Sequence, residues 1–364
     1  MRAFPSFRTA VAVAESVLRA AYVPVIPDPT RSRDRSGPST REAVSARLTL
    51  VWQRLVLSAM RGAAGGIQRL SRPASLRLGT ALGRVAYTFG ARARRRAYAN
   101  LRLAFGDGLD SAGQRRVARG VFEHFGRATV DFLRAPSLTP DALDREVTCE
   151  GWGNVETVLA LGKGVILVTG HIGSWEVMGR WLATVKHLPV TVVAKQPRDA
   201  AFARYVRKMR EGAGFAVLDR GDSVRDLLRA LRGGGVVLLL SDQNSGDIFL
   251  PFFGVPAGTA VGPATIAART GAPLVPIYSI QREDGSLHVT FEPAIPIDST
   301  ADKSREVARV TGCVNASLEA MIRRYPEQWL WLHDRWKAAF DEKNYPRAWS
   351  DRAAFESARA AWLS

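Results

Sequence analysis

The pattern of apolar positions divides the chain near residue 146. Beyond that point, short runs that are apolar throughout alternate with windows in which apolar side chains recur at helical spacing. Such runs are typical of strands covered on both faces, and their alternation with helices is typical of a mainly parallel sheet. We therefore predict an α/β fold class, a mainly parallel central sheet covered by helices. Strands are expected at residues 164–169, 190–194, 215–218, 236–241, 273–280 and 287–291, and helices at 174–185, 200–211, 222–232, 262–270 and 303–324.

The first 145 residues have a different character. Residues 29–45 are rich in Pro, Ser, Gly and charged residues, which is typical of a flexible segment. From about residue 46 the apolar spacing becomes helical, with breaks near residues 72–73, 106–108 and 135–136. The expected division is an N-terminal extension over 1–45, a basic amphipathic helical region over 46–145, an α/β domain over 146–340 and a C-terminal tail over 341–364.

The net charge of +17 is unevenly distributed along the chain. Residues 51–100 contain ten arginines and no Asp, Glu or Lys, with aliphatic and aromatic residues between them. A basic amphipathic segment of this kind favours an anionic membrane surface, where each basic residue contributes on the order of 1 kcal/mol. Nucleic-acid binding is the competing explanation, but the chain has no zinc-finger spacing and no aromatic RNA-binding signature. We expect anionic membrane lipid as a partner and no nucleic acid.

No stretch of the chain is a convincing transmembrane span. The best candidate, residues 48–70, is interrupted by Arg54, Arg61 and Arg69, whereas a span needs about 20 mostly apolar residues. Residues 9–26 are apolar but interrupted, and they lack a cleavage-type ending, so a secretory signal is not expected. The protein is predicted to be peripheral or monotopic.

Cysteine and histidine usage indicates neither a disulfide framework nor a metal site. Cys149 and Cys313 lie far apart and match no redox or metal spacing, which favours a reducing cytoplasmic setting. The five histidines include no pair at zinc-ligand spacing, so no metal ligand is expected.

The strongest candidate for chemistry is His171, which follows an apolar run and precedes Glu176 by five residues. Histidine titrates near neutrality, and a carboxylate can fix its tautomer, so the pair suits proton abstraction from an alcohol. On one continuous helix, residues five apart point roughly 140° apart, so the two meet only if the chain turns between them. Gly173 permits that turn, and Ser174 is a plausible N-cap for the following helix. The competing interpretation is that His171 is a structural histidine beside an apolar run.

A second carboxylate, Asp242, follows another predicted strand. Ligands in such sheets bind beyond the carboxyl ends of the strands, so the chain order can bring Asp242 to His171. Asp also occurs at such positions merely to start a turn. The chain has no Gly-x-Ser-x-Gly elbow, no P-loop and no Gly-x-Gly-x-x-Gly after a strand, which argues against serine hydrolases, nucleotide hydrolases and dinucleotide enzymes.

Five ordered blocks of residues carry a family resemblance. The most specific is Gly170-His171-Ile172-Gly173-Ser174-Trp175-Glu176, and it is followed by Val193-Ala194-Lys195 with residues 205–214, by Ser241-Asp242-Gln243 with residues 251–257, by residues 262–276, and by residues 325–337. Together, over residues 46–338, they resemble the bacterial lipid A late acyltransferases (lauroyl and myristoyl transferases), within the lysophospholipid acyltransferase group. The first block is similar to that family's Gly-His-x-Gly-Asn-Trp-Glu, which contains a His-x4-Asp/Glu motif. Ser174 departs from the usual Asn.

The resemblance implies a glycerolphosphate-acyltransferase-like fold and an O-acyl transfer reaction. An acyl chain would pass from an acyl thioester, on acyl carrier protein or coenzyme A, to a hydroxyl of a lipid acceptor. The acceptor implied first is a lipid A precursor, with lysophospholipids and phosphatidylinositol mannosides as alternatives. The expected location is the cytoplasmic face of the inner membrane, and no cofactor beyond the thioester is implied.

The resemblance also suggests site residues. His171 would act as general base, oriented by Glu176. Asp242, Gln243, Gly173 and Ser174 would support the site, Lys195 and Arg210 would bind substrate phosphate or the oxyanion, and Phe252 and Phe253 would line an acyl groove. A solvated helix face or an ion pair explains Lys195 and Arg210 equally well. A buried loop contact does the same for Phe252 and Phe253. A catalytically silent membrane-binding protein and a thioesterase or lipid hydrolase remain open as other classes.

Overall fold

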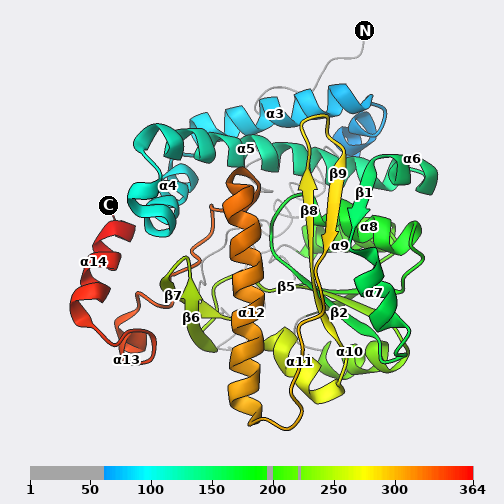
Figure 1. Ribbon diagram of the computed structural model, residues 1–364. Helices are drawn as coiled ribbons and strands as arrows, with labels where there is room; N and C mark the ends of the chain where they lie inside the picture. Colours follow the sequence, from blue (N-terminus) through cyan, green and yellow to red (C-terminus); the bar gives the residue numbers. More distant parts are fainter. Residues whose placement is uncertain (1–60, 195–199, 220–222, 364) are drawn as a thin grey trace, which may run out of the picture.

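A computed structural model describes residues 61–194, 200–219 and 223–363. The extension predicted over residues 1–45 and the start of the basic region lie outside this range. A seven-stranded sheet has the order β1-β9-β8-β2-β5-β3-β4, and all neighbours are parallel except β8 and β9 (Figure 1). The strands are β1 (Val147–Glu150), β2 (Val165–Thr169), β3 (Val190–Ala194), β4 (Ala216–Asp219), β5 (Val236–Leu240), β8 (Leu274–Gln281) and β9 (Leu287–Phe291).

The predicted fold class and six of the predicted strands are confirmed. The helices between them are α8 (Trp175–Thr184), α9 (Ala200–Glu211), α10 (Ser223–Arg232), α11 (Gly262–Thr270) and α12 (Lys303–Arg324), close to the predicted bounds. Alternate residues of the central strands face opposite layers, as the pleat requires. Val165 and Leu167 pack with α8, whereas Ile166 and Val168 pack with α10, α11 and α12.

Several elements were not predicted. β1, the short helix α7 (Trp152–Leu159) and the antiparallel hairpin of β6 (Ile248–Phe252) and β7 (Val255–Thr259) were not recognised in the sequence. The C-terminal tail contains α14 (Arg352–Leu363), which lies beside α4 (Figure 1). Phe355 of α14 is fully buried, so this segment belongs to the folded core.

The helical region before the sheet consists of α3 (Arg72–Phe89), α4 (Ala91–Phe105), α5 (Ser111–Arg134) and α6 (Pro140–Arg145). The three predicted breaks are present, and a further break at Gly90, between α3 and α4, was not predicted. α3 and α5 lie side by side across one end of the molecule, next to the turn between β8 and β9 (Figure 1). The close approach depends on glycine, because a Cβ at Gly83 would lie 2.2 Å from the Phe122 carbonyl oxygen. Among the described residues, no helix is both long and apolar enough to cross a membrane.

The short remaining elements complete the chain. They are the 3₁₀ turns η1 (Gly106–Gly108), η2 (Ala135–Ser137), η3 (Pro326–Gln328) and η4 (Glu342–Asn344), and the helix α13 (Tyr345–Ala348). Trp329, Trp331 and Trp336 are fully buried in one aromatic cluster with Phe252 and Phe253.

Candidate active site

His171 lies in a tight turn between β2 and α8. Gly173 adopts φ +61°, and a Cβ there would lie 1.3 Å from the Ser279 carbonyl oxygen, so only glycine fits. The turn is held from the other side by the chain after α12. The Gly173 amide donates to the Gln328 carbonyl at 2.9 Å, and the Leu330 amide donates to the His171 carbonyl at 3.1 Å. These contacts fix the backbone on which His171 stands.

The carboxylate that contacts His171 is Asp242. The Nδ1 of His171 lies 2.8 Å from Oδ1 of Asp242, and the His171 amide donates to Oδ2 at 2.7 Å. The strand register explains this pairing, because Thr169 of β2 lies opposite Leu240 of β5, and His171 and Asp242 each follow two residues later. The side chain of Asp242 is fully buried, whereas that of His171 is 20% exposed.

Asp242 is itself held in place by the segment after α12. Nε1 of Trp329 donates to Oδ2 at 2.8 Å, so both carboxylate oxygens accept hydrogen bonds. Burial alone would raise the pKa of Asp242, but the interactions with His171, and the proximity of His333, outweigh it and hold the pKa well below its usual range. An ionised Asp242 keeps the proton of neutral His171 on Nδ1 and stabilises the charged imidazolium. Nε2 of His171 has no hydrogen bond to any described residue, and the side chain is partly exposed.

The predicted pairing of His171 with Glu176 is wrong, because the two side chains have other partners in this structure. Glu176 lies in the first turn of α8 and pairs instead with Arg210 near the end of α9, with Nη2 to Oε1 at 2.5 Å and Nε to Oε1 at 3.1 Å. Burial lowers the pKa of Arg210, but Glu176 more than compensates and the net pKa is raised. The turn directs Glu176 toward α9, while the neighbouring strand already places a carboxylate at His171.

The sequence profile of the family described as bacterial lipid A biosynthesis acyltransferase matches residues 46–338. The chain belongs to this family. It is therefore a lipid acyltransferase, and the predicted family resemblance and enzyme class are confirmed.

Individual relatives act on two kinds of glycolipid. The phosphatidylinositol mannoside acyltransferase of Mycobacterium tuberculosis (strain H37Rv) is 28% identical over 228 residues, 60% of this chain and 70% of the relative. The lipid A biosynthesis lauroyltransferase of Escherichia coli (strain K12) is 26% identical over 280 residues, 74% of this chain and 88% of the relative. The E. coli palmitoleoyltransferase of lipid A biosynthesis is 26% identical over 274 residues, 74% and 87% of the two chains.

The other predicted site residues of this acyltransferase are only partly brought together. Ser174 occupies the N-cap position of α8, but its buried hydroxyl caps no amide and has no hydrogen-bond partner among the described residues. Gln243 is exposed beside Asp242, and Lys195 lies outside the described residues. Phe252 is fully buried against Trp329, with ring centroids 5.7 Å apart, and Phe253 packs beside it. Both phenylalanines are core side chains here, and a role in an acyl groove stays a prediction.

Sequence reasoning missed three residues that organise the site. Trp329 contacts Asp242, His333 lies 3.2 Å from the Asp242 carbonyl through Nε2, and His124 of α5 lies 3.2 Å from the Gly173 carbonyl through Nε2. Burial lowers the pKa of His124 to about 3, with a smaller contribution from nearby Arg127, so this side chain is neutral and donates. The block at residues 325–337 was recognised as part of the family pattern, and that block was the available signal for Trp329 and His333.

The described residues offer no group of three His, Cys, Asp or Glu side chains that could hold a metal ion. Asp131 of α5 is buried and pairs with Arg72. The candidate active site is thus the His171–Asp242 pair, framed by the turn and by Trp329.

Proposed function

We propose that this acyltransferase moves a fatty acyl chain from an acyl thioester to a hydroxyl group of a lipid A precursor, with His171 as the general base. The observation that carries the proposal is the orientation of His171. Asp242 accepts from Nδ1, so the lone pair of the neutral ring lies on Nε2, on a partly exposed side chain. This is the arrangement that proton abstraction from an alcohol requires.

The proposed reaction needs no acyl-enzyme. The acceptor hydroxyl gives its proton to Nε2 of His171 as its oxygen attacks the thioester carbonyl carbon, forming an ester C–O bond and a tetrahedral oxyanion. The carbon–sulfur bond then breaks, and the imidazolium returns the proton to the leaving thiolate. Asp242 stabilises the imidazolium between these steps. Each balanced step uses only the protein, the acceptor and the thioester, so neither a metal nor another cofactor is called for.

The oxyanion needs hydrogen-bond donors, which are worth a few kcal/mol each. The Gly173 amide is already used, because it donates to Gln328. The amides of Ser174 and Trp175 open α8 and have no acceptor among the described residues, so we assign them this role. Trp175 lies edge-on to the His171 ring, with centroids 5.1 Å apart.

Glu176 and Arg210 act in the proposal as positioning residues. Their ion pair joins the start of α8, which carries these amides, to the end of α9. Both side chains are mostly buried, with 16% and 23% exposure, so the pair is only partly screened by solvent. Lys195 and Gln243 stay candidates for contact with the acceptor.

The basic helical region supports a peripheral location at the cytoplasmic face of the inner membrane. Phe89, at the end of α3, is 68% exposed, in a sequence stretch rich in arginine. An apolar ring among basic side chains suits an anionic lipid surface. The same positive charge attracts acidic donors such as acyl carrier protein and coenzyme A.

A phosphatidylinositol mannoside is the second candidate acceptor, because a relative that acylates this lipid is 28% identical to the chain. The test is transfer of labelled acyl chains from acyl carrier protein and from coenzyme A to lipid A precursors, phosphatidylinositol mannosides and lysophospholipids. Labelled ester on one acceptor class would identify the substrate. Free fatty acid without any acylated lipid would contradict the proposal and favour a thioesterase.

A further inference from the structure

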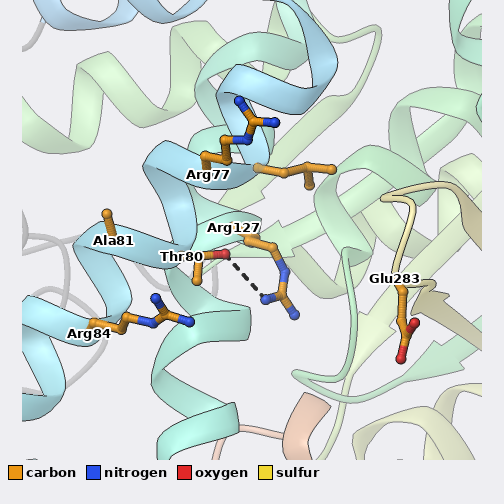
Figure 2. Close-up of a pocket in the computed structure, with 7 residues that line it drawn as sticks. Arg77, Thr80, Ala81, Arg84, Arg127 and Glu283 are labelled. Carbon is orange, nitrogen blue, oxygen red and sulfur yellow. Dashed lines mark hydrogen bonds between the residues drawn. The ribbon is translucent and has the colours of Figure 1, made fainter.

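A cavity of about 460 Å³ lies between α3, α5 and the turn joining β8 to β9, away from His171 (Figure 2). Arg77, Thr80 and Arg84 of α3 and Arg127 of α5 line it on one side, and Glu283 of the β8–β9 turn lines it on the other. None of these side chains touches His171 or Asp242. The reaction proposed above does not use this cavity.

The cavity has an excess of positive charge. Arg84 is paired with Glu123, at 2.8 Å, but Arg119 shares the same carboxylate at 2.9 Å. Arg77 is exposed and has no hydrogen bond or ion pair with any residue that the structure describes. Three arginine side chains therefore line a space to which the lining itself supplies a single carboxylate, Glu283.

Arg127 is oriented without being neutralised. Its Nε donates to Oε1 of Gln281 at 2.7 Å, and its Nη1 points to the Thr80 hydroxyl at 3.5 Å (Figure 2). Nε2 of Gln281 is in turn fixed by Asp131 at 2.8 Å. Within the described ranges, no carboxylate lies within ion-pair distance of Arg127. Burial lowers the pKa of Arg127, and the nearby but non-contacting carboxylates of Glu123 and Asp131 offset this only in part.

The cavity also lies next to residues that hold the turn at Gly173, between β2 and α8. Arg127 follows His124 by three residues on α5, which corresponds to about 4.5 Å along the helix axis. His124 contacts the Gly173 carbonyl, and Gln281 exchanges two hydrogen bonds with Gln328, at 2.9 and 2.7 Å. The residues that hold Arg127 therefore belong to the same hydrogen-bonded network as the turn at Gly173.

We propose that this cavity binds a phosphate group, carried either by the headgroup of an anionic membrane lipid or by a small soluble phosphate. A guanidinium group can donate two parallel hydrogen bonds to the oxygens of a phosphate. Several arginines that line one space therefore favour an anion of high charge density. The volume accommodates a phosphate together with part of a polar headgroup. The negative charge of Glu283 repels the phosphate, and this repulsion limits the affinity of the cavity for it.

Binding is measured on the full chain at constant ionic strength, by calorimetric titration with inorganic phosphate and by sedimentation with vesicles. One set of vesicles contains phosphatidylcholine and phosphatidylglycerol. The other contains phosphatidylcholine and oleate at matched surface charge, so that its net negative charge comes from a carboxylate and not from a phosphate headgroup. Arg77→Ala should weaken phosphate binding about fivefold, and Glu283→Gln should strengthen it by a similar factor, the ratio expected for one charge near the anion.

Arg269→Ala, on α11 at the opposite end of the molecule, is the matched control (Figure 1). It removes one exposed arginine, and it should change neither the binding of inorganic phosphate nor the binding of the vesicles. Arg127→Gln is the second variant and should weaken binding at least as much as Arg77→Ala. Thermal unfolding of every variant separates lost binding from lost folding.

The two arms distinguish the sources of the phosphate. Weaker binding of Arg77→Ala to phosphatidylglycerol vesicles, with oleate vesicles unaffected, supports a lipid headgroup. Weaker binding of inorganic phosphate alone supports a soluble ligand. Equal effects of Arg77→Ala and Arg269→Ala, equal losses on both kinds of vesicle, or no change with either probe would overturn the proposal.

Discussion

Asp242→Asn tests the orientation of His171 while preserving the shape of the site. Oδ2 of Asp242 accepts from two donors, the His171 amide at 2.7 Å and Trp329 Nε1 at 2.8 Å, so the amide oxygen of asparagine must occupy that position. The NH₂ group then takes the place of Oδ1, 2.8 Å from Nδ1 of His171. Since an NH₂ group donates, Nδ1 must accept, and the ring proton moves to Nε2.

That change of tautomer removes the lone pair with which His171 would take the acceptor proton, and it also removes the charge that stabilises the imidazolium. The corresponding exchange in a histidine–aspartate pair lowers the catalytic rate by about 10⁴-fold, or about 5.5 kcal/mol of activation free energy. We expect a loss of roughly 10³ to 10⁴-fold here. The assay is the initial rate of acyl transfer at saturating thioester, together with the thermal unfolding midpoint.

The hydrogen bonds at Oδ2 survive the substitution, so the midpoint should change little compared with the rate. Retention of more than a tenth of the wild-type rate by a folded Asp242→Asn protein would refute the assignment of Asp242. A large drop in the unfolding midpoint would show that the carboxylate serves the fold instead.

The remaining predictions concern the surroundings of the pair. Glu176→Gln and Arg210→Gln should each lower the transfer rate, and the double variant should be no slower than the worse single one, because both remove the same ion pair; additive losses would separate their roles. Gly173→Ala should lower the free energy of unfolding by at least about 2 kcal/mol, since its Cβ would overlap the Ser279 carbonyl, and a stability like that of wild type in chemical denaturation would contradict the geometry. His124 has a folded pKa of about 3, below the ordinary value of 6.5, so the unfolded chain binds the extra proton as pH falls through 6.5 and stability is lost toward acid pH. His124→Gln should therefore flatten the decline of unfolding free energy between pH 6 and 5 by up to about 1.4 kcal/mol per pH unit, and an unchanged slope would contradict neutral burial. Treatment with a chelator should leave the transfer rate unchanged, and a loss that a divalent metal restores would contradict the reaction scheme.

The sheet was predictable because its central strands are apolar on both faces. Val165–Thr169 and Val236–Leu240 are bounded by glycine or polar residues, so their ends were clear in the sequence. The hairpin of β6 and β7 was not recognised. Each strand contains a proline, and most residues of β6 are only half-buried, so the sequence of the hairpin resembles that of a loop. α14 was predicted as a tail because Phe355 becomes buried, and Trp362 partly buried, only by packing on other segments of the chain.

The active site was predictable only in part. The glycine turn and His171 are local features, and the structure confirms the turn between β2 and α8. Which of two carboxylates contacts His171 depends on strand order, since β5 lies beside β2 although β3 and β4 come between them in the chain. The role of Trp329 depends on the same long-range arrangement, through the bridge between Ile172 and Trp329. No local pattern contains that information.

The central claim, that His171 takes the proton of the acceptor hydroxyl, is tested most directly by the single-turnover rate of acyl transfer in His171→Ala. The measurement uses the acceptor on which the wild-type protein is most active, at equal amounts of lipid-bound, folded protein. The account predicts that labelled acyl lipid forms at least about 10³-fold more slowly than with the wild type. A rate within tenfold of wild type would contradict it and would require another group to act as the base.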